Sequence, residues 1–235
     1  MSYNEVLTAQ DEALAKTFNA AMARVYLWMA AGLGLTAVVA MLVAQSEGIT
    51  AVVFGSPWTV LGLCGAQMVL VVTISRSINR LAPATALGLF FLYSALMGVT
   101  LSPLFLAFDL GTIAGAFVAT VATFGAMAII GLTTKKDLTC AGPLCMMALL
   151  GLIVAVVVNL FLQNSALEWI VSFAGIAVFL GLTAHDSQAI KTMTAESLTG
   201  ADEAVVGRVG VLGALSLYLD LLNLFMFILS LMGDD

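Results

Sequence analysis

Three ionisable residues stand out in this chain because they lie in strongly apolar surroundings. His185 and Asp186 are neighbours in GLTAHDSQAI (Gly181–Ile190), and His185 is the only histidine among 235 residues. Asp220 lies in SLYLDLLNLF (Ser216–Phe225), where it is the only charged residue. Carboxylates in such places can bind a cation or exchange a proton, and histidine changes charge between about pH 5 and 8.

Asp220 shares one helical face with Ser216 at i−4 and Asn223 at i+3, so the three would form a polar stripe. An aspartate deep in a membrane costs about 2.5–3.5 kcal/mol on insertion scales, so Asp220 should face the protein interior, a partner or water. Two interpretations stay open. Asp220 is either a protonated residue that only holds helices together or, as we favour, part of an ion or proton pathway.

Asp186 sits near the end of its apolar segment, where a carboxylate at a water interface costs little. Helical geometry places the side chain of His185 on a different face from that of Asp186. An interfacial anchor is therefore the alternative interpretation for both residues.

The composition predicts an all-α integral membrane protein. The chain is 62% hydrophobic and 9% charged, whereas soluble domains carry about 25% charged residues. We expect a cytoplasmic N-terminal segment over residues 1–24 and a seven-transmembrane-helix domain over residues 25–235, because runs of about twenty apolar residues can cross a bilayer. The expected spans are Val25–Ala44, Pro57–Ser75, Ala82–Leu104, Thr112–Leu132, Leu144–Leu162, Trp169–Ser187 and Val211–Met232.

The charges predict the orientation. All basic residues fall in the N-terminal segment or in alternate loops, and the opposite side carries only acidic ones. The basic residues are Lys16, Arg24, Arg76, Arg80, Lys135, Lys136, Lys191 and Arg208. The acidic residues of the opposite side are Glu47, Asp109, Glu168, Asp234 and Asp235. The positive-inside rule then predicts a multi-pass inner membrane protein with a cytoplasmic N-terminus and an external C-terminus.

Several function classes lack their signatures. The sequence has no second histidine for a metal cluster and no HExxH motif. The flanks AHDSQ and YLDLLN differ from the Y-D and G-x-G-D patterns of intramembrane aspartyl proteases. The last span has no lysine for retinal, and no basic tract suggests nucleic acid. We therefore predict a membrane protein that is not an enzyme, needs no cofactor and does not bind nucleic acid.

Four segments resemble the transmembrane Bax inhibitor motif family. They are FLYSALMGVTLSP (Phe91–Pro103), TTKKDLT (Thr133–Thr139), GLTAHDSQAI and ALSLYLDLLNLF (Ala214–Phe225). The resemblance implies a seven-helix bundle with the last helix central and a pH-dependent calcium leak across the membrane. It implies that Asp186 and Asp220 form the pH-sensing pair that binds calcium ions or protons, and that Arg80 latches onto them, with Arg76 as the reserve.

The chain departs from the family pattern in two places. His185 stands where an aromatic residue, often tyrosine, is common, so we expect His185 to modulate the pH response. The polar connector from about Gln188 to Gly210 also looks longer than in some bacterial relatives. The expected boundaries of the sixth and seventh spans place Asp220 roughly 10 Å deeper in the membrane than Asp186.

The resemblance also leaves a second function open. Some bacterial relatives associate with a membrane-anchored AAA protease, so the alternative is a membrane interaction protein that regulates such a protease or a stress or cell-death response. A channel needs the carboxylates, whereas an adaptor needs the N-terminal segment or the connector. Ion flux through the purified protein distinguishes the two functions.

Overall fold

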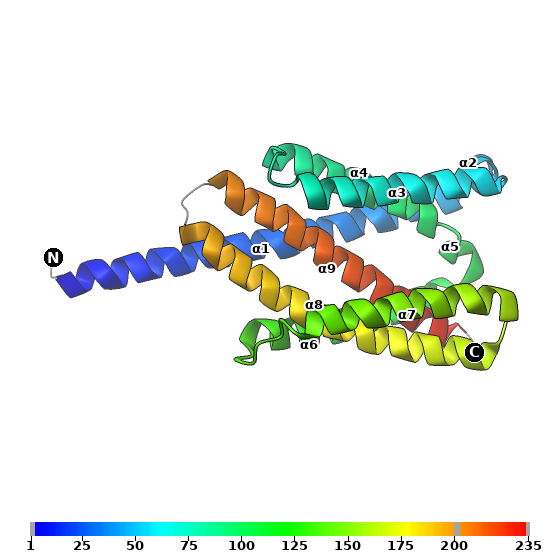
Figure 1. Ribbon diagram of the computed structural model, residues 1–235. Helices are drawn as coiled ribbons and strands as arrows, with labels where there is room; N and C mark the ends of the chain where they lie inside the picture. The colour runs from blue at the N-terminus through cyan, green and yellow to red at the C-terminus, as the bar shows by residue number, and fades with distance from the viewer. Residues whose placement is uncertain (1–2, 200–202, 234–235) are drawn as a thin grey trace. The chain divides into compact units, whose positions relative to one another are not determined.

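The computed structural model describes residues 3–199 and 203–233, and every element within these ranges is a helix (Figure 1). The elements are α1 (Tyr3–Ala44), α2 (Glu47–Phe54), α3 (Pro57–Ser77), α4 (Pro83–Leu101), α5 (Leu104–Ala107), α6 (Leu110–Thr133), α7 (Ala141–Leu162), α8 (Ser165–Thr199) and α9 (Glu203–Met232). The all-α prediction is confirmed.

The described residues contain seven helical stretches that are long and apolar enough to cross a membrane. They are Ala15–Ala44, Pro57–Ser77, Pro83–Ala107, Leu110–Thr133, Ala141–Leu162, Ser165–Leu198 and Ala204–Met232. The predicted number of spans is therefore confirmed. The expected boundary at residue 24 falls inside α1, and the division of the chain at that point stays a prediction.

Local sequence explains where several helices begin. Pro57 and Pro83 are the first residues of α3 and α4, a position where proline is favoured because no N–H is needed there. Asp109 caps α6, and its Oδ1 accepts hydrogen bonds from the backbone N–H groups of Gly111 and Thr112 at 2.8 and 3.0 Å. The connections between the spans are thus encoded by short-range chemistry.

The helices of the sixth and seventh apolar segments extend past the expected boundaries at Ser187 and Val211, because most of the polar connector is helical. α8 continues twelve residues past Ser187 (199 − 187) to Thr199, and α9 begins at Glu203, well before Val211. The extension of α8 is rich in helix-forming alanine, lysine, glutamate and leucine, and it buries Ile190 and Thr194. The polar run therefore marks where the apolar surface ends, while the helix itself continues.

The chain forms two compact units, and each is described by itself. Unit 1 contains Met1–Pro103 and Ile190–Leu215. Its α1 and α4 pack closely, since a Cβ on Gly98 would lie 2.6 Å from the Thr36 carbonyl oxygen. The Thr36 hydroxyl also donates to the Ser94 carbonyl at 2.9 Å. Small residues thus allow the backbones of these two helices to approach, which is common in membrane proteins.

Unit 2 contains Leu104–Ala189 and Ser216–Asp235. Within it α7 and α8 lie side by side (Figure 1). Gly181 of α8 packs against the Cys145 sulfur of α7, and Gly131 of α6 lies directly against the Ala184 backbone of α8. The unit is thus built on glycine contacts around the C-terminal half of the sixth apolar segment.

α9 contributes to both units and is the most buried span. In its most apolar stretch 61% of the residues are buried, against at most 33% in the other six. A helix at the centre of a bundle has this burial pattern. The prediction that the last helix is central is confirmed.

Candidate ion-binding site

Residues of α7, α8 and α9 within unit 2 line a cavity of about 690 Å³. All the predicted site residues that belong to unit 2 line this cavity. The polar residues that line it are His185, Asp186, Ser216, Asp220 and Asn223. Its remaining wall consists of Gly142, Pro143, Met146, Leu149, Ile153, Phe179, Leu182 and Leu219. A mainly apolar cavity with a few converging polar groups is the usual form of a small-ligand site.

Asp220 is the most unusual residue of the cavity. It is 5% exposed, and its Oδ2 atom has no hydrogen-bond partner among the described residues. Buried polar atoms in proteins are nearly always paired, so an unpaired carboxylate oxygen calls for an explanation. In a carboxylate that only joined helices, both oxygens would accept hydrogen bonds from neighbouring donors. Asp220 Oδ2 accepts none from the described residues.

Asp186 lines the same cavity as Asp220. The expected depth difference of about 10 Å does not separate them. The error came from the boundaries, because Asp186 is 13 residues from the end of α8 (199 − 186) and Asp220 is 17 residues from the start of α9 (220 − 203). The extension of α8 beyond Ser187 and that of α9 before Val211 leave both carboxylates well inside their helices.

The predicted polar stripe on α9 faces this cavity. Ser216, Asp220 and Asn223 all line it. The side-chain amide of Asn223 donates to the Leu219 carbonyl one turn earlier at 2.8 Å. The stripe therefore supplies hydroxyl and amide oxygens next to the Asp220 carboxylate.

His185 was expected on a different face from Asp186, and this expectation was wrong. Its Nδ1 lies 2.9 Å from Asp186 Oδ1, with the two side chains 24% and 23% exposed. The ring packs directly against α7 at Gly142, where a Cβ would lie 2.5 Å from His185 Nε2. The histidine is therefore held between the first turn of α7 and the carboxylate of Asp186.

Sequence reasoning missed Gln188, which connects α8 to the loop between α6 and α7. Its Oε1 accepts from the Leu138 backbone N–H at 2.8 Å, and its Nε2 donates to the Lys136 carbonyl at 2.9 Å. In the same loop the hydroxyl and backbone N–H of Thr139 donate to Asp137, which lowers the pKa of that carboxyl group. The motif TTKKDLT thus forms a structured turn just before the N-terminus of α7.

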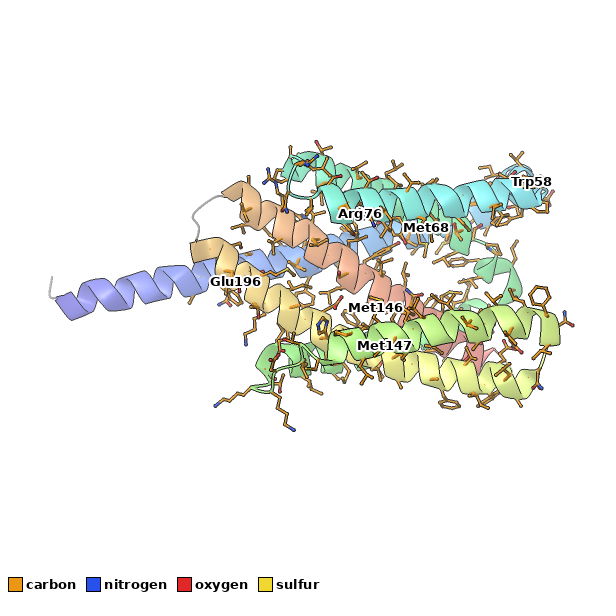
Figure 2. All side chains as sticks on the ribbon, viewed as in Figure 1. Trp58, Met68, Arg76, Met146, Met147 and Glu196 are labelled. Atoms are coloured by element: carbon orange, nitrogen blue, oxygen red, sulfur yellow. The ribbon has the colours of Figure 1, made fainter. Side chains whose placement is uncertain are left out.

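The candidate latch residues belong to unit 1. Arg80 is exposed in the turn between α3 and α4. Arg76, labelled in Figure 2, is exposed in the last turn of α3. Arg208 of α9 donates from Nε to the Leu81 carbonyl at 2.9 Å and so holds that turn. Because the aspartates belong to unit 2, the contact of Arg80 with them stays a prediction.

The cavity offers few ligands to a metal ion. Among the residues that the structure describes, no three His, Cys, Asp or Glu side chains are grouped as a metal site would require. Calcium prefers six to eight oxygen ligands. Asp186 and Asp220 with the neutral oxygens of Ser216 and Asn223 would hold such an ion only with water completing its shell.

A match to a protein family shows to which family the chain belongs. Residues 18–235 match the family described as "Inhibitor of apoptosis-promoting Bax1". The chain belongs to the Bax inhibitor-1 family. The match covers all seven candidate spans almost completely and confirms the resemblance that the four sequence segments indicated.

Curated relatives in the Bax inhibitor-1 family match over nearly the whole chain. "Inner membrane protein YbhL" of Escherichia coli is 43% identical over 213 residues, 91% of both chains. A protein of Deinococcus radiodurans with no described function is 40% identical over 232 residues, 98% of this chain and 96% of its own. A protein of Borreliella burgdorferi, also without a described function, is 38% identical over 216 residues and 92% of both chains.

Proposed function

We propose that this Bax inhibitor-1 family protein allows slow, pH-gated passage of a cation, calcium in the first place, across the bacterial inner membrane. One observation carries the proposal: Asp220 has a buried carboxylate oxygen without a hydrogen-bond partner among the described residues, in a cavity shared with Asp186. An ionisable residue at this depth in a membrane protein usually marks an ion or proton pathway.

Two anionic carboxylates in one cavity repel each other, and either a cation or a proton relieves this repulsion. Like charges in a low-dielectric site repel each other, so both carboxylates are stable as anions only when a cation lies between them. Protonation of one carboxylate removes the repulsion without a cation. In this proposal protons and calcium ions therefore compete for the Asp186–Asp220 pair.

The small number of ligands supports passage rather than storage. Conduction requires an ion to be attracted into a site and also to leave it. Two carboxylates with the oxygens of Ser216 and Asn223 attract a divalent cation but do not complete its shell. In this proposal Arg80 competes with the cation for the carboxylates from the cytoplasmic side, and His185 sets the pH range through Asp186.

The location follows from the relatives and from the charge distribution. YbhL of Escherichia coli is named as an inner membrane protein, and we extend this location to the present chain. The one-sided distribution of lysine and arginine supports a cytoplasmic N-terminus and an external C-terminus.

Calcium uptake into liposomes that contain only the purified protein tests the function. We expect uptake that exceeds that of protein-free liposomes and that changes with pH between about 5 and 8. Calcium uptake that does not change with pH would contradict the gating mechanism. Uptake equal to that of empty liposomes at every pH would contradict the channel and favour the interaction protein that regulates an AAA protease.

A further inference from the structure

The two walls of the cavity differ in chemistry. α7 contributes Met146, Leu149 and Ile153, so its wall is apolar, whereas α8 contributes both apolar side chains (Phe179, Leu182) and polar ones (His185, Asp186). α9 contributes the polar side chains of Ser216, Asp220 and Asn223, together with Leu219. From Gly142 to Ile153 the α7 wall covers eleven helical steps (153 − 142), or roughly 16 Å of helix. A bare metal ion would use the polar wall and leave the apolar wall unoccupied.

The apolar wall reaches the surface of the protein. Met146, labelled in Figure 2, and Ile153 line the cavity although they are 53% and 51% exposed. α7 is also the least buried candidate span, with 6% of its most apolar stretch buried. An exposed apolar face of a membrane span lies against lipid, so the cavity can receive molecules that dissolve in the bilayer.

We propose that this cavity binds an amphipathic primary amine, with its ammonium group at Asp220 and its single alkyl chain along the α7 wall. A primary ammonium has three N–H donors and no acceptor, which suits the unpaired Oδ2 atom of Asp220 and the nearby oxygens of Asp186 and Ser216. The cavity volume of about 690 Å³ lies within the ordinary range of small-molecule sites.

Other occupants fit the walls less well. A carboxylate or phosphate group would meet two carboxylates of its own sign. A phospholipid with an amine headgroup carries that phosphate and a second acyl chain, so a free single-chain amine is the occupant that matches both walls. The inference goes beyond ion passage, because binding at equilibrium does not require conduction.

The test compares three ligands of equal chain length: hexylammonium, hexanol and hexanoate. Binding is measured by equilibrium dialysis against the full-length protein in phosphatidylcholine nanodiscs, with empty nanodiscs as background. We expect saturable hexylammonium binding at least about tenfold tighter than hexanol, because a charge-assisted hydrogen bond is stronger than a neutral one. Hexanoate should not bind above background. Methylammonium should bind at least about tenfold more weakly than hexylammonium, because it lacks the methylenes that contact the apolar wall.

Two matched variants assign the ammonium site. Asp220→Asn should reduce hexylammonium affinity about tenfold or more while leaving hexanol binding unchanged, which shows that the cavity is intact. Glu168→Gln removes a carboxylate from an exposed position of α8 and should leave both affinities unchanged. Phosphatidylethanolamine in the nanodiscs should not reduce hexylammonium affinity.

Three results would overturn the proposal. Hexanol binding as tight as that of hexylammonium would reveal only an apolar cavity. An unchanged hexylammonium affinity in Asp220→Asn would place the ammonium elsewhere, and competition by phosphatidylethanolamine would point to a lipid headgroup site. Calcium uptake into liposomes is measured separately, so the failure of amine binding and the failure of ion passage are distinguishable.

Discussion

Asp220 differs from the polar residues that only hold helices together. Polar side chains that hold membrane helices together do so by hydrogen-bonding across the interface, as Gln67 of α3 does when its Nε2 donates to Thr100 of α4 at 2.7 Å. Asp220 is also buried, but its Oδ2 has no such partner among the described residues. The difference between these two residues is the reason to assign ion or ligand binding to Asp220 and packing to Gln67.

His185 offers a test at the same scale. The replacement His185→Tyr introduces a side chain that does not change charge between pH 5 and 8. We expect maximal calcium flux in liposomes to stay similar, while the midpoint of its pH response shifts, because His185 contacts Asp186 at 2.9 Å.

His185→Gln is the matched control, since glutamine keeps a hydrogen-bonding group without a titrating one. It should shift the midpoint in the same direction as tyrosine. Flux curves of the wild type and both variants that superimpose between pH 5 and 8 would show that the histidine does not influence the carboxylates.

Among the elements, the contact of α6 with α8 depends on one glycine. A side chain on Gly131 would collide with the backbone of Ala184, which cannot move as a flexible side chain would. We expect Gly131→Ala to destabilise the protein by about 1–3 kcal/mol, the usual cost of overpacking. The measurement is thermal unfolding in detergent.

Gly125→Ala provides the control on the same helix. No atom outside the local backbone lies within 4 Å of a Cβ at Gly125. Alanine should be neutral there or stabilise the helix by up to about 1 kcal/mol. Equal effects of the two substitutions would show that the α6–α8 contact is not close.

The cap of α6 gives a pH-dependent prediction. Hydrogen bonds from the side chain and backbone of Thr112 lower the pKa of Asp109 below its ordinary value of 3.8. A lowered pKa in the folded state means that the ionised group stabilises the protein above the ordinary pKa, and that this contribution is lost as the pH falls through the folded pKa. Asp109→Ala should therefore lower the Tm at pH 7 by a few degrees, and by less near pH 3.

Asp109→Asn separates charge from capping. Asparagine caps helices about as well as aspartate, so this variant should retain most of the Tm at pH 7 and lack the pH dependence. A gap between Asp109→Ala and the wild type that stays constant down to pH 3 would contradict the role of the ionised carboxylate.

The spans could be predicted from the sequence because each is an apolar run, and a bilayer accepts little else. The end of α8 at Thr199 and the start of α9 at Glu203 could not be predicted, because polar residues such as Lys191 and Glu196 continue a helix as readily as they form a loop. At the site, Asp186 and Asp220 were recognisable as charges in apolar segments. Gly142 and Gln188 were not, because their roles arise only when α7 and its preceding loop pack against α8.

At the scale of the whole molecule, the orientation in the membrane remains to be tested. All eight lysine and arginine residues lie on one predicted side. A reporter enzyme that works only outside the cytoplasm should therefore be active when fused after Asp235. The same reporter inserted between Lys135 and Lys136 should be inactive. The opposite pattern would reverse the orientation. Activity at neither site would place both sites in the cytoplasm and contradict the odd number of spans predicted between them.

The most direct measurement of the central claim is a pH titration of calcium flux through Asp220→Asn and the wild type, each purified and reconstituted in liposomes. Asparagine keeps the shape of aspartate but cannot bind or release a proton. The account predicts that wild-type flux changes between about pH 5 and 8 and that the variant, although folded, loses this pH dependence. If the variant instead shows the flux and pH profile of the wild type, Asp220 is a structural residue and the proposed gating is wrong.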